Sequence, residues 1–166
     1  MDKDAEYAEF VSARWLMLVR AALALGCTLA EAEDVAQATL VKVYVAWAKV
    51  ARADHQDAYV SKMLVNVRRD ALRKRRETPV AVLPDNTIVD VTGHFDASDA
   101  IRRAVRKLSQ GQREVIALRY YIRLTEPEIA SVLGIAPGTV KSRLSRALGA
   151  LSTDTDLTDL RDGGTL

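Results

Sequence analysis

Apolar residues recur at intervals of three and four along most of this 166-residue chain, a period typical of amphipathic α-helices. Over 30–50, for example, the apolar stripe consists of Ala36, Leu40, Val43 and Trp47. The same period predicts helices over 7–25, 30–50, 57–76, 98–108 and 112–122, followed by two more over 125–151. The expected fold class is therefore all-α.

Each predicted helix has an apolar side that we expect to face a core. Over 57–76 this side consists of Tyr59, Met63, Val67 and Leu72, widened by Val60 and Leu64. In the second half of the chain, the inward positions are expected to include Ile101, Ala104, Val115, Leu118, Tyr120, Val140, Leu144 and Leu148.

The segment 77–97 has a different character, with two prolines, a glycine, several β-branched residues and no helical period. Compact domains rarely contain an irregular loop longer than about 12–15 residues. We therefore predict a flexible linker between two small helical domains, over 1–76 and 98–151. Short strands over 80–83 and 88–91 are conceivable, although a lone hairpin is only marginally stable. The acidic residues 152–166 are expected to form a frayed tail.

The segment 125–151 has the features of a helix-turn-helix. Thr125 and Glu128 fit a capping box, Gly134 suits a left-handed helix end, and Pro137 suits the first position of the next helix. The second helix of such a motif can lie in the major groove of duplex DNA. Its outer face is predicted to contact DNA and carries Thr139, Lys141, Ser142, Arg143, Ser145 and Arg146.

The predicted helix 57–76 ends in a dense cluster of cations. Within nine positions it carries six, offset only by Asp70: Arg68, Arg69, Arg73, Lys74, Arg75 and Arg76. The helix dipole accounts for one or two cations at a helix end, so the cluster indicates a nucleic-acid face. Asn66 precedes it by one turn and, with Tyr59 and Lys62, suits unpaired bases, which are bound by stacking and hydrogen bonds. A surface amide without a role is the alternative for Asn66.

The residues of the helix 30–50 that lie off the apolar stripe and point outward include Asp34, Gln37, Val41 and Lys42. Such a side can be a docking surface, although solvation alone is the commoner explanation.

Several classes of protein do not fit the composition. The net charge of +2 is too small for a strongly basic nucleic-acid protein, and Cys27 is a single cysteine, which fits a reducing compartment. No basic leader and no long apolar run appears, so we expect a cytoplasmic protein without membrane insertion. His55 and His94 lie in expected loops, and no phosphate loop, metal-spaced cluster or nucleophile motif is present. We expect no enzyme activity, no metal and no cofactor.

Three strings resemble the bacterial extracytoplasmic-function (ECF) sigma factors of RNA polymerase. AEDVAQATLVKVYVAW is similar to the family's helix for docking on the polymerase clamp, with matches at Glu33, Asp34 and Gln37, while Ala38 and Leu40 depart from it. AYVSKMLVNVRRDALRKRR resembles the helix that melts the minus-ten element, with Asn66 where a flipped base is captured. GTVKSRLSRA resembles the helix that reads the minus-thirty-five element as duplex.

The resemblance implies a protein that binds core RNA polymerase and promoter DNA, with an anti-sigma factor as a possible partner. It implies polymerase docking by Asp34, Gln37 and Val41, and single-strand contacts by Tyr59, Lys62, Asn66, Arg68, Arg69 and Arg73. The alternative is a stand-alone dimeric helix-turn-helix regulator, which would bind a palindromic operator. The cluster over 68–76 favours the first reading, because a sensor domain needs no second nucleic-acid face.

Overall fold

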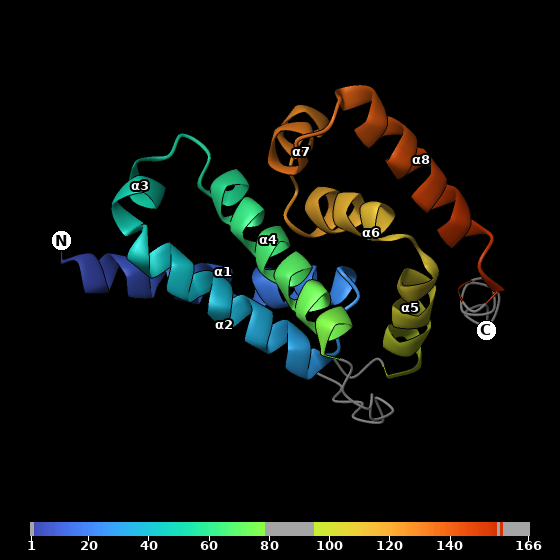
Figure 1. The fold of residues 1–166 in the computed structure, drawn as a ribbon, viewed down its shortest axis with the longest axis horizontal. Coiled ribbons are helices and arrows are strands. Elements are labelled where there is room, and N and C mark those ends of the chain that lie inside the picture. The colour runs from blue at the N-terminus through green and yellow to red at the C-terminus, as the bar shows by residue number, and fades with distance from the viewer. Residues whose placement is uncertain (1, 79–94, 156, 158–166) are drawn as a thin grey trace, which may run out of the picture.

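The computed structural model describes residues 2–78, 95–155 and 157, and these residues contain helices and no strand (Figure 1). The all-α prediction is confirmed. The helices are α1 (Lys3–Ala24), α2 (Leu29–Val45), α3 (Trp47–Arg52), α4 (Gln56–Glu77), α5 (Phe95–Lys107), α6 (Gln110–Ile116), the π-helix η1 (Ala117–Tyr121), α7 (Glu126–Leu133) and α8 (Pro137–Ser152). The conceivable strands over 80–83 and 88–91, and most of the tail, lie outside the described residues. Within the described part, no helix is long and apolar enough to cross a membrane.

Local side-chain caps explain where several helices begin. Thr28 accepts a hydrogen bond from the Glu31 N–H at 3.1 Å, and the Glu31 carboxylate accepts one from the Thr28 N–H at 3.2 Å. Ser109 caps α6 in the same reciprocal way. Thr125 accepts from the N–H of Glu128, and Gly134 ends α7 at a φ of 65°, a left-handed conformation that glycine adopts without steric cost. The left-handed end predicted at Gly134 is confirmed. Of the capping box predicted at Thr125 and Glu128, the structure contains the bond from the Glu128 N–H to the Thr125 hydroxyl, without the reciprocal bond that Glu31 and Gln112 make at the other two caps.

The prediction of a single helix over 30–50 is wrong at one point, because the structure has two helices there: α2 ends at Val45 and α3 begins at Trp47. Trp47 is buried, with its ring 5.3 Å from that of Phe10 and 5.7 Å from that of Tyr7, both edge to face. The break at Ala46 is accompanied by this aromatic packing, which a helical period alone does not indicate.

The helix predicted over 112–122 begins as α6 and continues as η1. The N–H of Ile122 bonds to the carbonyl of Ala117, five residues earlier, at 3.2 Å. A π-turn contains more residues than an α-turn, so it changes which side chains face inward. Tyr120 is accordingly 51% exposed and not buried as expected.

The buried side of α4 also differs from the prediction. It consists of Val60, Ser61, Leu64, Val65 and Arg68, whereas Tyr59, Met63, Val67 and Leu72 are only half-buried or exposed. A period based on apolar residues misses Ser61, whose hydroxyl donates to the carbonyl of Asp57, and Arg68, one nitrogen of which donates to Glu31. Ile101 and Leu148 were likewise expected inside, and both are exposed.

The two halves of the chain share one hydrophobic core. Its buried residues include Leu18 and Leu64 from the first half and Leu118 and Ile129 from the second. Helix α1 packs against α2 and also against η1. Helix α4 lies between α2 and α7 (Figure 1). A helical unit of 60–70 residues buries only a modest fraction of its surface. Packing the two halves together therefore adds apolar burial that neither half achieves alone.

Candidate nucleic-acid interface

Helix α4 presents five of the predicted single-strand residues on one face. They follow one another at steps of three and four, which places them opposite the buried Leu64: Tyr59, Lys62, Asn66, Arg69 and Arg73. All five are exposed, and we call them the α4 stripe. The stripe combines an aromatic ring, an amide and three cations, the side chains that stack on, hydrogen-bond to and neutralise a single strand.

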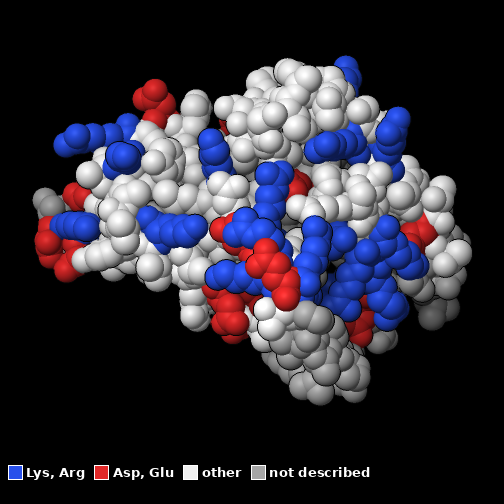
Figure 2. All heavy atoms as spheres, in the orientation of Figure 1, with Lys and Arg blue, Asp and Glu red and all other residues white. Residues whose placement is uncertain are grey.

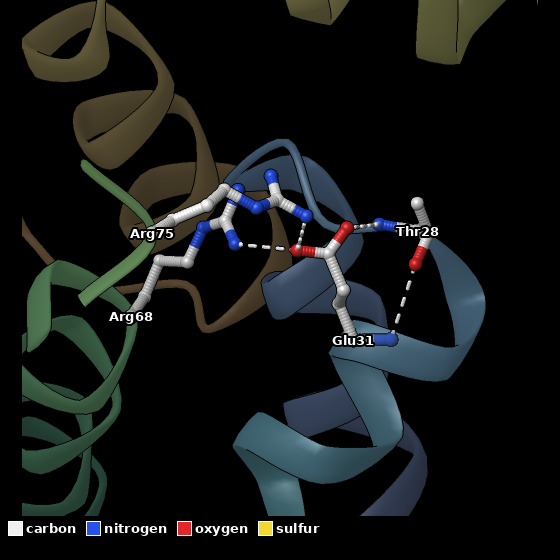
Figure 3. A network of polar contacts seen from close by, with 4 residues as sticks. All are labelled: Thr28, Glu31, Arg68 and Arg75. Carbon is white, nitrogen blue, oxygen red and sulfur yellow. Dashed lines mark hydrogen bonds and ion pairs between the residues drawn. The ribbon is translucent and has the colours of Figure 1, made fainter. Parts of the chain in front are cut away.

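Arg68 is the sixth predicted residue, and it lies on the other side of α4. Its side chain is only 6% exposed, and one guanidinium nitrogen lies 3.1 Å from the Glu31 carboxylate (Figure 3). Arg75 pairs with the same Glu31 oxygen at 2.9 Å. Arg68 thus fastens α4 to the start of α2, and this arrangement does not present it to DNA. Helix phase was the available signal, since position 68 continues the buried row of Val60 and Leu64.

The Glu31 carboxyl lies at the centre of this polar cluster. Its partial burial opposes ionisation, but the Thr28 N–H and the guanidinium groups of Arg68 and Arg75 outweigh that effect and hold the pKa of Glu31 below its ordinary value. A carboxyl whose pKa is lower in the folded than in the unfolded state stabilises the fold above the unfolded value, here 4.5, and loses that contribution as the pH falls through the folded value.

We expect Glu31→Gln to lower the free energy of unfolding by about 1–3 kcal/mol at pH 7, because the buried Arg68 and the more exposed Arg75 both lose a charged partner. The difference from the unmodified protein should shrink as the pH falls below about 4.5, where the unfolded chain takes up the proton first, and should be smallest below the lowered folded pKa, where Glu31 is protonated in both states. Urea unfolding of both proteins from pH 3 to pH 7 measures this difference in the free energy of unfolding. Glu33→Gln, at an exposed position of α2, is the matched control. A loss that stayed constant down to pH 3 would contradict the assigned role of the charge.

Cys27 lies close to this cluster and is fully buried. Burial raises the pKa of its thiol to about 11, against the partial opposing effect of the nearby Arg68. The thiol is therefore protonated at neutral pH, which makes it a poor nucleophile.

Helix α8 exposes a polar face made of Lys141, Ser142, Ser145 and Arg146. Val140, Leu144 and Ala147 hold the opposite side of the helix in the core. The other two predicted residues, Thr139 and Arg143, are half-buried and do not belong to this exposed face. Arg143 packs against Gly111, where a Cβ added to the glycine would lie 3.1 Å from the guanidinium carbon of Arg143. The structure therefore brings four of the six predicted duplex contacts together on one open surface.

Basic side chains gather where α4 ends and α5 begins, with a few acidic side chains among them (Figure 2). Helix α5 contributes a set of cations that sequence reasoning did not single out: Arg102, Arg103, Arg106 and Lys107. Four cations in six positions were the available signal. The surface potential there is expected to favour polyanions.

The outer side of α2 carries the predicted docking residues. Asp34 and Gln37 are exposed, and Val41 is 62% exposed. Val45, one turn further on, is 80% exposed and shares their face, although sequence reasoning missed it. The two exposed valines therefore lie one turn apart on the side of α2 that carries the predicted docking residues. Among the described residues, no group of three or more His, Cys, Asp or Glu side chains is arranged to hold a metal ion.

In comparisons with known proteins, the first and second halves of the chain match two different family models. Residues 13–78 match Sigma-70 region 2, and residues 98–151 match Sigma-70, region 4. The chain is 33% identical to the RNA polymerase sigma-E factor of Streptomyces avermitilis, over 93% of this chain and 88% of that protein. It is 34% identical to the ECF RNA polymerase sigma factor SigL of Mycobacterium tuberculosis, over 89% and 85%.

A solved structure shows the same architecture. The sigma factor RpoE, in complex with the anti-sigma factor NepR from Bartonella quintana, matches with a TM-score of 0.72 at 27% identity, covering 94% of this chain and 98% of that chain.

Proposed function

Because this chain belongs to the extracytoplasmic-function sigma factors of the sigma-70 family, we propose that it binds core RNA polymerase through α2 and directs the enzyme to promoters. The α4 stripe holds the unpaired minus-ten strand, and the α8 face reads the minus-thirty-five duplex. The protein performs this work in the cytoplasm, and the polymerase carries out the chemistry.

One observation carries this proposal: the chain has two separate exposed faces suited to nucleic acid, on α4 and on α8. The first suits single strands, because aromatic and amide groups stand next to cations. The second suits a major groove, because its small polar and basic side chains lie on one helix, α8, against which α7 packs. A stand-alone helix-turn-helix regulator needs only the second face.

The first test is binding to core RNA polymerase that lacks any sigma factor. The purified chain should co-elute with core enzyme on a sizing column and then start transcription at specific sites in a library of promoter fragments. Failure to bind core, together with dimeric binding to a palindromic duplex, would instead establish the regulator function.

We expect Val41→Ala to weaken binding to core polymerase about tenfold, because an exposed valine that becomes buried at an interface contributes about 1–1.5 kcal/mol. Fluorescence titration of labelled chain with core enzyme measures the affinity. Leu16→Ala, which removes an exposed apolar side chain from α1, should leave it unchanged. Equal losses in both variants would show that the contact is not specific to α2.

We also propose that an anti-sigma factor inhibits this chain. The RpoE relative was solved with an anti-sigma factor bound, and this chain has the same two-region fold. We therefore expect that an anti-sigma factor can hold this chain away from polymerase.

A further inference from the structure

Three arginine side chains gather at the turn between α1 and α2. Arg68 and Arg75 of α4 donate to the same Glu31 oxygen, at 3.1 and 2.9 Å, and their guanidinium groups lie side by side (Figure 3). Arg113 of α6 reaches the same turn, because a Cβ added to Gly26 would collide with the Nη1 atom of Arg113. We call Arg68, Arg75 and Arg113 the arginine cluster.

The Cys27 thiol indicates that the three cations lie around one point. Cys27 follows Gly26 in the turn and is buried. Burial raises the pKa of this thiol to about 11, and each arginine of the cluster acts to lower it. Because the interaction between charges falls off with distance, side chains from α4 and α6 converge on this turn although they are far apart in the sequence.

The arginine cluster carries more positive charge than its paired groups neutralise. Glu31 pairs with both α4 arginines, whereas Arg113 has no carboxylate partner in the described part of the chain. The Nε of Arg113 donates instead to the carbonyl of Leu108, a neutral group, at 3.1 Å. Three guanidinium charges against one carboxylate leave two positive charges in the cluster.

Two observations indicate that this excess charge is costly to the chain. The Arg68 side chain is only 6% exposed, and its buried Nε has no hydrogen-bond partner among the described residues. Burial lowers the pKa of Arg113, and the charges of Arg68 and Arg106 lower it further. Buried donors and buried charges are normally hydrogen-bonded or paired, so the cluster is suited to a ligand that brings acceptor atoms and negative charge.

The members of the cluster differ in their exposure to solvent. The Arg75 side chain is 48% exposed and Arg113 is half-buried, whereas Arg68 is buried. Arg75 and Arg113 can therefore touch a ligand that arrives from solvent, while Arg68 adds its charge from within the fold.

The charge and the shape of the cluster define the class of ligand. A guanidinium group matches the oxygens of phosphate in a bidentate arrangement. Two positive charges suit a phosphate monoester, which carries a charge of about −1.5 to −2 at pH 7, better than a nucleic-acid backbone, which carries one negative charge per phosphate. We propose that the arginine cluster is a binding site for a phosphate monoester, such as a phosphorylated metabolite. This site goes beyond the proposed sigma function and does not depend on it.

The test is a titration of the full-length chain with methyl phosphate and, separately, with dimethyl phosphate. At about pH 7.5 the first is a dianionic monoester and the second a monoanionic diester with the same chemical groups. The readout is the NMR signals of the arginine Nε–H groups, which substitution assigns to individual residues. Arg75→Gln and Arg113→Gln remove one cation each from the cluster, and Arg76→Gln removes the same charge from an exposed neighbour as the matched control.

We expect methyl phosphate to shift the Nε–H signals of the arginine cluster to saturation and dimethyl phosphate to leave them nearly unchanged. Arg75→Gln and Arg113→Gln should each weaken the binding of methyl phosphate roughly tenfold, because each removes a charge-assisted hydrogen bond. Arg76→Gln should change the affinity by less than about twofold, because an exposed charge outside the site is screened by salt. Circular dichroism checks that each variant is folded, and Arg75→Gln, at an exposed position, tests the site even if Arg113→Gln unfolds the chain.

Three results would overturn the proposal. Signals that do not respond to methyl phosphate would show that the cluster binds no monoester. An equal response to dimethyl phosphate would show that the cluster attracts any phosphate, as a nucleic-acid face does. Equal losses in Arg75→Gln and Arg76→Gln would show attraction to a basic surface without a defined site. None of these results depends on whether the chain binds core polymerase, so failure of the site and failure of the sigma function are distinguishable.

Discussion

Leu18→Ala is expected to lower the free energy of unfolding by about 3–5 kcal/mol, because it leaves a cavity in a fully buried position. Leu18 lies on α1, which packs against α2 of the first half and η1 of the second. For a chain of this size the melting temperature should fall by roughly 6–20 °C. Both halves contribute to the same core, so both should lose stability together.

Leu16→Ala is the matched control, since it makes the same chemical change two residues away at a side chain that is 49% exposed. We expect a change within about 0.5 kcal/mol there. Urea unfolding followed by circular dichroism, together with Trp fluorescence from Trp15 and Trp47, measures both variants. A fluorescence transition that moved without the circular dichroism transition would show that the two halves unfold separately and do not share one core.

Features specified by neighbouring residues were predictable from the sequence. The hydroxyl cap at Thr125 and the left-handed Gly134 each depend on a few adjacent positions, and each appears in the structure as expected. The helix-turn-helix followed from those signals, because capping, turn and apolar period agree there. The DNA and polymerase contacts assigned to these helices stay predictions.

Features set by distant contacts were not predictable in this way. Arg68 and Arg69 are adjacent and chemically identical, yet one is bound to Glu31 of α2 and the other to Glu114 of α6. No local pattern separates them, because their partners lie 37 and 45 residues away. The break at Ala46 and the π-helix at Ala117 both lie where the chain packs against α1, through Trp47 in the first case and through η1 in the second, and neither contact is visible in a local pattern.

Asn66→Ala is expected to reduce the rate of promoter opening by about 5- to 150-fold, equivalent to roughly 1–3 kcal/mol, while core binding stays unchanged. The reason is geometric. Asn66 occupies the centre of the α4 stripe, fully on the outer side of the helix, so its amide can pair only with a group that approaches from outside. An unpaired base offers donors and acceptors on the edge that duplex pairing otherwise hides.

Two readouts separate capture of a base from general attraction to DNA. Opening is followed with a fluorescent base in the minus-ten element, and each base of that element is then replaced in turn. Asn66→Ala should remove the preference at one position. Lys74→Ala, an exposed cation outside the α4 stripe, should weaken binding equally on every sequence and reduce its salt dependence. If Asn66→Ala behaved like Lys74→Ala, the amide would only be a surface group, and base recognition would have to lie elsewhere on α4. If it removed discrimination at a single base, the amide would be the reading group, with the Arg69 guanidinium one turn away on the same face of α4.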